Sequence, residues 1–258
     1  MLGLPIAHSR SPQLHLAAYR ALGLTDWTYD RIECGAEQLP GLVDSLGPEW
    51  VGLSVTMPDK FAALAYAQER TARAELVGSA NTLVRTIDGW RADNTDIDGV
   101  AGALGQTVSG RALILGAGGT APAALVGLDV LGIEHVTVAA RNPDRAARLL
   151  EIAGKLGVSA QYCAIEPDAL GREVAQAAVV VSTVPADAAA PLAITLASAP
   201  VLLDAIYNPW PTPLAAAVAA AGGRVVSGLQ MLLHQAFAQV EQFTGRPAPR
   251  TQMAAALA

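Results

Sequence analysis

"LILGAGGTAPAA", residues 113–124, is the stretch that decides the fold, because an apolar run ends in glycines and an alanine-rich segment follows. Gly116, Gly118 and Ala121 fit the pattern G-x-G-x-x-(G/A), directly after a predicted strand and at the opening of a predicted helix. The first glycine permits a tight turn, and the second lets a pyrophosphate approach the backbone at the positive end of the helix. In this setting the pattern predicts a dinucleotide-binding unit rather than an ordinary turn between a strand and a helix.

Strands and helices alternate on the carboxyl side of this stretch. Residues 135–140 ("HVTVAA") read as a second strand, and residues 142–157 ("NPDRAARLLEIAGKLG") as a helix with a turn-like opening and a glycine stop. Residues 177–185 and 200–207 are two further apolar runs of strand length. Such runs separated by helices are typical of a parallel sheet covered on both faces, so this region is expected to form a doubly wound domain.

The end of the second strand indicates which dinucleotide is bound. An NAD-binding protein usually carries an acidic residue there, about 20 residues after the first glycine, for the ribose hydroxyls. Here Ala139 and Ala140 end the strand, and Arg141 and Arg145 follow. Two arginines would hold a 2′-phosphate through charge-assisted hydrogen bonds. We therefore expect NADP(H) rather than NAD(H); the alternative interpretation is two solvated arginines at a helix start.

The segment before residue 98 also alternates between helices and strands. Residues 11–24 are expected to form a helix capped by Ser11, with Pro12 at its first position. Residues 58–78 begin with a proline and an aspartate and are expected to form one longer helix. Residues 27–34 and 50–58 read as strands, residues 80–94 as a hairpin that turns at Asp88-Gly89, and residues 228–245 as an amphipathic helix.

Composition excludes several classes of protein. The chain has 258 residues, 52% of them apolar and 16% charged, with a net charge of −6, which is unlike a disordered chain or a nucleic-acid-binding protein. No apolar run is long enough to cross a membrane, and the N-terminus lacks a signal-peptide pattern. Cys34 and Cys163, like the four histidines, show no metal-ligand spacing. We expect a cytoplasmic protein that binds no metal, with its cysteines reduced.

Motifs along the chain resemble those of the shikimate dehydrogenase family. They are "GLPIAHSRSPQLH" (3–15), "SVTMPDK" (54–60), "GSANTLV" (78–84), "ADNTDIDG" (92–99), "LGAGGTAPAA" (115–124), "DAIYNPWPTPL" (204–214) and "GLQMLLHQAFAQVEQFTG" (228–245). These motifs occur in the family's order and cover nearly the whole chain. Together they are far more specific than any one of them alone.

The resemblance implies a fold, a reaction and a set of site residues. It implies an α/β protein with a substrate-binding domain (residues 1–98 plus 228–258, the C-terminal helix returning to it) and a Rossmann-type NADP-binding domain (99–227). The implied reaction is the reversible, NADPH-dependent reduction of 3-dehydroshikimate to shikimate in aromatic amino-acid (chorismate) biosynthesis. The implied substrate-binding residues are Ser9, Ser11, Thr56, Asn81, Tyr207 and Gln235. The implied cofactor-binding residues are Gly116, Ala117, Gly118, Gly119, Thr120, Arg141, Arg145, Thr183, Ala205 and Gly228.

Lys60 and Asp96 are the implied catalytic residues. Reduction of a ketone puts negative charge on its oxygen as hydride reaches the carbon, and a nearby ammonium can stabilise that charge and donate the proton. An aspartate beside such a lysine keeps it in position and favours its charged form. The sequence leaves open which of the two delivers the proton. Read alone, Lys60 would be a solvated lysine at a helix start, where the helix dipole mildly disfavours a cation.

Some positions depart from the family's usual residues. Ser54 and Ala140 stand where asparagine is common, and the segment around Thr183 lacks the usual asparagine and threonine content. Two other functions stay open: a quinate or dual quinate/shikimate dehydrogenase of the same fold, and a non-catalytic NADP-binding sensor. The chain is expected to be a monomer or a homodimer.

Overall fold

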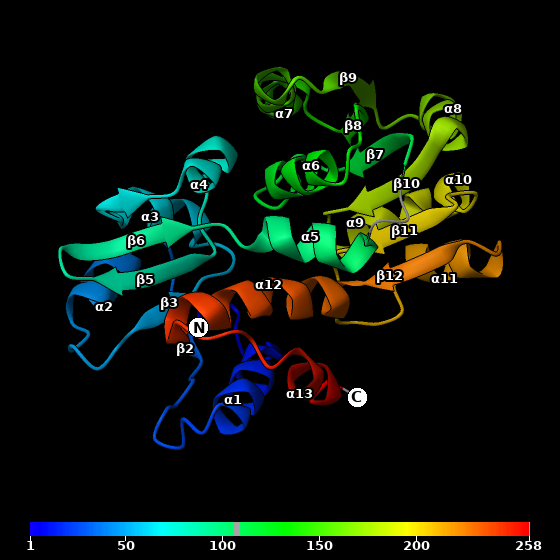
Figure 1. Cartoon of the computed structure of the whole chain (residues 1–258). Coiled ribbons are helices and arrows are strands. Elements are labelled where there is room, and N and C mark those ends of the chain that lie inside the picture. Colours follow the sequence, from blue (N-terminus) through cyan, green and yellow to red (C-terminus); the bar gives the residue numbers. More distant parts are fainter. Residues whose placement is uncertain (106–108, 258) are drawn as a thin grey trace. The chain divides into compact units, whose positions relative to one another are not determined.

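The computed structural model describes residues 1–105 and 109–257. The chain divides into two compact units. Unit 1 comprises Met1–Thr95 together with Leu232–Ala258, and unit 2 comprises Asp96–Met231. The last long helix, α12 (Gly228–Thr244), begins in unit 2 and runs on into unit 1 (Figure 1).

Unit 2 is a six-stranded parallel sheet with helices on both faces (Figure 1). The strand order is β12-β11-β10-β7-β8-β9, which is the doubly wound arrangement predicted from the alternation of strands and helices. The strands are β7 (Arg111–Leu115), β8 (His135–Ala140), β9 (Ser159–Ala164), β10 (Ala177–Ser182), β11 (Val201–Asp204) and β12 (Arg224–Ser227). The helices are α5 (Asp96–Leu104), α6 (Ala121–Val130), α7 (Pro143–Leu156), α8 (Pro167–Gln176), α9 (Ala186–Ala189), α10 (Ala193–Leu196) and α11 (Pro213–Ala220), with a 3₁₀ turn at Ala190–Leu192.

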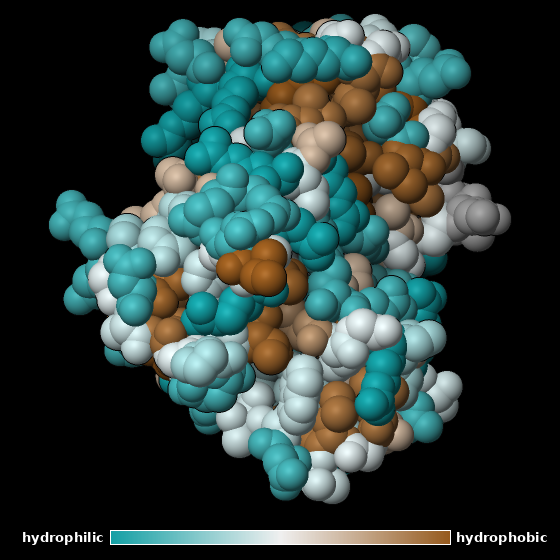
Figure 2. Space-filling view, turned by 60° about the vertical axis from the view of Figure 1, so that its left-hand side comes forward, coloured by the Kyte–Doolittle hydropathy of each residue, from teal (hydrophilic) through white to brown (hydrophobic). Residues whose placement is uncertain are grey.

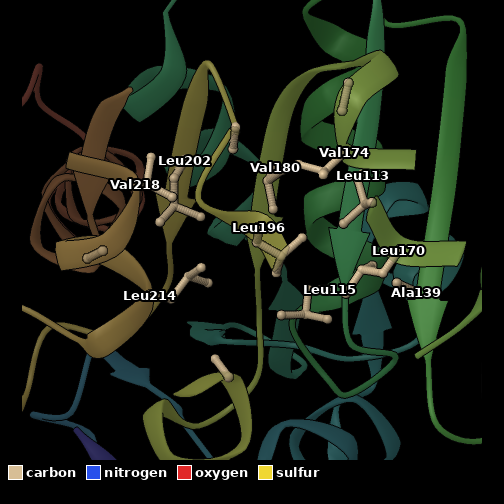
Figure 3. Close-up of a cluster of buried hydrophobic side chains, with 14 of the residues drawn as sticks. Leu113, Leu115, Ala139, Leu170, Val174, Val180, Leu196, Leu202, Leu214 and Val218 are labelled. Atoms are coloured by element: carbon tan, nitrogen blue, oxygen red, sulfur yellow. The ribbon is translucent and has the colours of Figure 1, made fainter. Parts of the chain in front are cut away.

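The core of unit 2 consists of aliphatic side chains. Figure 3 shows leucines and valines of α8, α10 and α11 packed against Leu113, Leu115, Val180 and Leu202 of the sheet. These four strand residues are fully buried, which is expected where helices cover both faces of a parallel sheet. Because the strands are fixed by apolar packing, their carboxyl ends are held side by side at one edge of the sheet.

Unit 1 is built from shorter elements. Its four-stranded sheet has the order β3-β5-β6-β4, and β1 pairs with β2 in a separate two-stranded sheet. The strands are β1 (Leu2–Gly3), β2 (Ile32–Glu33), β3 (Gly52–Ser54), β4 (Glu69–Arg70), β5 (Thr82–Thr86) and β6 (Gly89–Asp93). The helices are α1 (Ser11–Ala21), α2 (Leu39–Asp44), α3 (Lys60–Tyr66), α4 (Ala72–Val77), α12 and α13 (Arg250–Ala255).

Two local predictions for unit 1 are wrong. Residues 58–78 do not form one helix, because Ala67 is extended, Glu69–Arg70 pairs with β6, and Thr71 caps a second helix by accepting from Ala74 N. Ser11 does not cap α1: it is the first helical residue, and no side-chain cap hydrogen bond forms there. By contrast, the hairpin of β5 and β6 and the amphipathic helix α12 are confirmed.

The surface mixes polar and apolar residues. On the face shown in Figure 2, hydrophobic residues occur in several patches divided by hydrophilic ones. Exposed large apolar side chains include Met57 and Phe61 in unit 1 and Ile194 in unit 2. Among the helices of the described residues, none is both long enough and apolar enough to span a bilayer.

Candidate functional site

The glycine loop of residues 116–120 follows β7 and leads into α6. β7 and β10 are neighbours in the sheet, but the chain continues from β7 to β8 on one side and from β10 to β11 on the other. Doubly wound sheets bind ligands at this point, where the strand order reverses. Gly116 has a φ of +106°, and a Cβ there would lie 2.6 Å from Val184 Cγ1. A Cβ on Gly118 would meet nothing within 4 Å, so the backbone there is open to a ligand. The loop thus fits a phosphate group approaching the N-terminus of α6.

The other predicted cofactor residues of unit 2 lie at the same edge of this sheet. Thr183 follows β10, and both its N–H and its hydroxyl donate to Leu115 O, at 2.9 and 3.0 Å. Ala205 follows β11, and its N–H donates to Ser182 O at 2.9 Å. Gly228 follows β12, and a Cβ there would collide with the main-chain oxygen of Ala205. A glycine is therefore required where the loop after β11 passes the start of α12.

Arg141 and Arg145 are both exposed beyond the carboxyl end of β8. Between them, Asn142 caps α7: its Oδ1 accepts from Asp144 N at 2.8 Å and from Arg145 N at 3.4 Å. This cap fixes where α7 begins and so places Arg145 in its first turn. Two guanidinium groups in such positions have the chemistry required for a phosphate monoester.

In unit 1, main-chain hydrogen bonds bring three predicted site residues together. Lys60 is the first residue of α3, and its main-chain oxygen accepts from Ala80 N at 2.9 Å. The next residue, Asn81, accepts at its main-chain oxygen from Val55 N at 2.7 Å. Thr56 follows Val55 and is partly exposed, as is Lys60. Lys60, Thr56 and Asn81 therefore lie around the adjoining ends of β3 and β5.

Ser9 and Ser11 lie at the start of α1 and are both buried. Ser9 Oγ accepts from Ser11 N at 3.2 Å, and Arg31 donates to Ser9 O through two nitrogens, at 3.0 and 2.6 Å. Among the residues that the structure describes, Ser11 Oγ is a buried hydroxyl with no hydrogen-bond partner. A buried hydroxyl in this state is costly unless a ligand takes its hydrogen bond, as a carboxylate could.

Asn81 and Gln235, far apart in the sequence, are in direct contact in unit 1. Asn81 Nδ2 donates to Gln235 Oε1 at 3.2 Å and to Thr95 Oγ1 at 3.0 Å. Asn81 Oδ1 accepts from Thr95 N at 2.8 Å, and Thr95 Oγ1 donates to Gln235 Oε1 at 3.2 Å. Gln235 is only 6% exposed, so it does not face water as most glutamines of an amphipathic helix do.

The segment "DNT" at 93–95 is held at every residue. Asp93 accepts from Arg73 through both carboxylate oxygens, from Thr71 Oγ1 and from Gln242 Nε2. Burial alone would raise the pKa of Asp93, but hydrogen bonds from Arg73 and Thr71 lower it to about 2. Asn94 Nδ2 donates to Ser79 O at 2.9 Å. Asp96, the next residue after this segment, opens α5 in unit 2 and is 6% exposed.

Tyr207 is also in unit 2, in the loop that follows β11, and is partly exposed. Asp204 organises this loop, since its carboxylate accepts from Thr212 Oγ1 at 2.6 Å and from Ile206 N at 3.2 Å. Asp96 and Tyr207 thus belong to unit 2, whereas the residues gathered around Asn81 belong to unit 1. The proposed roles of Asp96 and Tyr207 rest on the motifs in which they stand.

Asp59 is an unusual carboxyl group that the sequence does not reveal. It is fully buried, and within the described part of the chain neither of its oxygens has a hydrogen-bond partner. Burial raises the pKa of Asp59 to about 6. Its position before Lys60 at a helix start suggested only an ordinary N-terminal aspartate, because burial cannot be read from a single polar residue.

Within the described ranges, His, Cys, Asp and Glu form no cluster suited to a metal.

Comparison with protein families gives two matches. A profile described as the shikimate dehydrogenase substrate binding domain matches residues 1–83, and one described as the shikimate 5′-dehydrogenase C-terminal domain matches residues 228–258. A curated relative, the shikimate dehydrogenase (NADP(+)) of Anaeromyxobacter sp. (strain Fw109-5), is 38% identical, over 100% of this chain and 94% of that protein.

Two solved structures are similar to this chain over nearly its full length. The crystal structure of Mycobacterium tuberculosis shikimate dehydrogenase is 71% identical in sequence with a TM-score of 0.96, over 99% of this chain and 97% of that one. The Thermus thermophilus shikimate 5-dehydrogenase, solved in complex with NADP(H) and shikimate, is 29% identical with a TM-score of 0.83, over 99% of this chain and 96% of that one.

Proposed function

Since the chain belongs to the shikimate dehydrogenase family, we infer that it catalyses the reversible, NADPH-dependent reduction of 3-dehydroshikimate to shikimate. The reaction is an oxidoreductase step of aromatic amino-acid (chorismate) biosynthesis. The observation that carries the inference is that the similarity runs through both units at nearly full length, so neither the substrate-binding nor the cofactor-binding part is missing. As part of the same proposal, the enzyme works in the cytoplasm as a monomer or a homodimer.

The residues of unit 2 are those that would hold NADP(H). The loop Gly116–Thr120 would face the pyrophosphate, with Ala117 and Gly119 supplying backbone N–H groups near the start of α6. Arg141 and Arg145 would bind the 2′-phosphate. Thr183, Ala205 and Gly228, at the ends of β10, β11 and β12, would lie along the nicotinamide half. The bound cofactor supplies or accepts the hydride.

In unit 1, polar side chains would bind the substrate. Ser9 and Ser11 present hydroxyls for a carboxylate, and Ser11 Oγ is a buried hydroxyl that a ligand would satisfy. Thr56 would contact the carboxylate or a ring hydroxyl. Asn81 and Gln235, which already touch each other, would hold the ring hydroxyls, and from unit 2 Tyr207 is proposed to contact the same substrate.

Lys60 is proposed to be the main acid/base group. As the carbonyl carbon of 3-dehydroshikimate becomes tetrahedral, Lys60 Nζ would stabilise the charge that develops on the oxygen and donate a proton to it. In the reverse direction, Nζ would accept the proton of the shikimate hydroxyl. Asp96 is proposed to orient that hydroxyl and to share the proton.

The direct test uses purified protein and the absorbance of reduced nicotinamide. The inference predicts that NADPH is consumed when 3-dehydroshikimate is added, and that NADP⁺ is reduced when shikimate is added. Quinate in place of shikimate should support a much lower kcat/KM; equal values would make the chain a dual quinate/shikimate dehydrogenase. Binding of NADPH without turnover of any of these substrates would contradict the inference and favour a sensor.

A further inference from the structure

A chain of hydrogen bonds in unit 1 connects Tyr29 to Asn81 through side chains that the proposed mechanism does not use. Tyr29 OH donates to Ser54 Oγ at 2.5 Å, and Ser54 Oγ donates to Gln239 Oε1 at 2.7 Å. Gln239 Nε2 donates to Thr82 Oγ1 at 2.8 Å and to Asn81 O at 3.0 Å. Thr82 Oγ1 donates to Asn81 Oδ1 at 2.8 Å.

The direction of each hydrogen bond in this chain is fixed by its neighbours. Asn81 O can only accept, so the Gln239 amide must turn its nitrogen toward β5 and its oxygen toward Ser54. Since Gln239 donates to Thr82 Oγ1, the Thr82 hydrogen is directed to Asn81 Oδ1. An oxygen at that position leaves Asn81 Nδ2 facing Gln235 Oε1. The Gln239 amide, acting through Thr82, therefore supports the same orientation of the Asn81 amide that the Thr95 N–H requires.

The central members of the chain are almost completely buried. Ser54 is 3% exposed, Gln239 1% and Thr82 0%. In surroundings of low dielectric constant, an unpaired polar group is costly, so removing one member of the network penalises the partners that it leaves behind. Gln239 also lies one helical turn beyond Gln235 on α12, so the same helix carries a predicted substrate residue and the residue that orients Asn81.

Asn81 in turn holds the backbone that precedes Asp96. Its Oδ1 accepts from Thr95 N at 2.8 Å, and Asp96 is the next residue along the chain. A rotation of the Asn81 amide would place a donor against this N–H and break the contact. The orientation of Asn81 that Gln239 supports is therefore also the one that holds the start of the segment carrying Asp96.

We propose that Gln239, supported by Ser54, is a positioning residue that orients the Asn81 amide for the hydroxyl groups of the substrate. The proposal rests on the proposed function and adds to it a residue that does not itself touch the substrate. A positioning role can be told apart from a purely structural one. Loss of a positioning Gln239 should weaken substrate binding through Asn81 and leave cofactor binding unchanged.

The test is a double-mutant cycle read by shikimate binding and by kinetics. Gln239→Met keeps the length of the side chain and removes its hydrogen bonds. We expect the Kd for shikimate, from calorimetry without cofactor, and the KM for shikimate to rise on the order of 10-fold, with the KM for NADP⁺ unchanged. In an Asn81→Ala background, the same substitution should raise neither value further, because its route to the substrate is gone.

Two control variants separate positioning from loss of stability. Thr137→Val removes a buried hydroxyl of unit 2 that binds Glu173 and Gln161, and Gln252→Met repeats the substitution at an exposed position of α13. The first should lower the Tm and the second should not, and both should keep wild-type values for shikimate. If Gln239→Met lowers only the Tm, or if its effect adds fully to that of Asn81→Ala, the proposal is wrong.

Ser54→Ala keeps the test decisive if Gln239→Met does not fold. It removes the donor to Gln239 Oε1, one of the three hydrogen bonds that hold that amide, so the same change in shikimate affinity is expected at a smaller size. An unchanged affinity in a folded Ser54→Ala protein would overturn the proposal. If the wild-type protein turns over shikimate and the variants show none of these effects, the positioning role alone is refuted. If the wild-type protein neither binds nor oxidises shikimate, the proposed function is refuted and the inference with it.

Discussion

Both units have apolar cores, but unit 1 buries many more polar side chains than unit 2. Unit 2 packs leucine, valine and alanine between its sheet and helices, as Figure 3 shows around Leu113 and Val180. Unit 1 holds most of the polar side chains that are buried in the described residues. Those of unit 1 are Ser9, Ser11, His15, Ser54, Asp59, Ser79, Asn81, Thr82, Asp93, Asn94, Thr95, Gln235 and Gln239, against Asp96, Thr137, Ser182, Asp204 and Thr212 in unit 2.

This difference matches the kind of ligand that each unit is proposed to bind. A dinucleotide can be held by backbone groups at strand ends and a helix start, so unit 2 needs a rigid apolar scaffold with glycines in the right places. A small polyhydroxylated acid is recognised through directed hydrogen bonds, so unit 1 needs polar side chains whose orientation is fixed by other polar groups. Substitutions among the polar side chains of unit 1 should therefore affect substrate binding, and substitutions around the glycines of unit 2 should affect cofactor binding.

The largest expected effect is on stability, from the core of unit 2. Leu113→Ala should lower the free energy of unfolding by about 2–5 kcal/mol, because Leu113 is fully buried and the cavity cannot collapse completely. Urea denaturation would measure this, with Ile194→Ala as control, since Ile194 is 91% exposed and should change stability by about 0.5 kcal/mol or less. A KM for shikimate that rose strongly in folded Leu113→Ala protein would break the proposed division between the units.

The next largest effect is on catalysis, from unit 1. Lys60→Ala should lower kcat by about 100-fold or more, with a smaller change in KM, because it removes the proposed proton donor. Lys155→Ala is the matched control, on the exposed side of α7. Steady-state kinetics with shikimate and NADP⁺ would decide, and a Lys60→Ala protein with near-normal kcat would refute the role.

A smaller effect should distinguish the two cofactors. Arg141→Ala and Arg145→Ala should each raise the KM for NADP⁺ by about 10-fold, because each removes a charged partner of the 2′-phosphate. The KM for NAD⁺, which lacks that phosphate, should stay the same. Arg172→Ala, at an exposed position of α8, is the control. Equal changes for both cofactors would mean that these arginines do not read the phosphate.

The smallest effect concerns pH and the buried histidine of unit 1. Burial lowers the pKa of His15 from 6.5 to about 3, helped by the nearby N-terminal ammonium. A neutral buried histidine contributes stability that is complete above pH 6.5 and is lost as the pH falls toward 3, because the unfolded chain binds the proton more readily. His15→Phe should remove this loss of folding stability, which is less than about 1 kcal/mol between pH 7 and pH 6. Urea midpoints at the two pH values would show it, and parallel changes in both proteins would contradict it.

Much of unit 2 could be predicted from the sequence, because its signals are local. The glycine pattern at 116–121, the apolar runs and the glycine stop at 157 each follow from neighbouring residues, and the observed sheet order agrees with them. β9 and β12 are not among the strands that the sequence predicts. β9 mixes exposed and buried residues without a clear apolar run, and β12 is only four residues long.

Less of unit 1 could be predicted, because its arrangement depends on contacts between distant residues. The predicted helix over 58–78 satisfied local preferences, yet pairing of Glu69–Arg70 with β6 divides it. Lys60, Asn81 and Gln235 were found through family motifs and not through periodicity. Gln239 and Thr95 stand in family motifs, but their roles could not be predicted from them, since the bond from Ser54 to Gln239 joins residues 185 positions apart.

Unit 1 is proposed to supply most of the groups that recognise the substrate, and unit 2 those that hold the cofactor. The most direct measurement is the Kd of shikimate and of NADP⁺, each titrated alone into Asn81→Ala and Arg145→Ala proteins. Asn81→Ala should bind shikimate on the order of 10-fold more weakly and NADP⁺ normally, and Arg145→Ala should do the reverse. A variant that lost both affinities to the same degree would contradict this division.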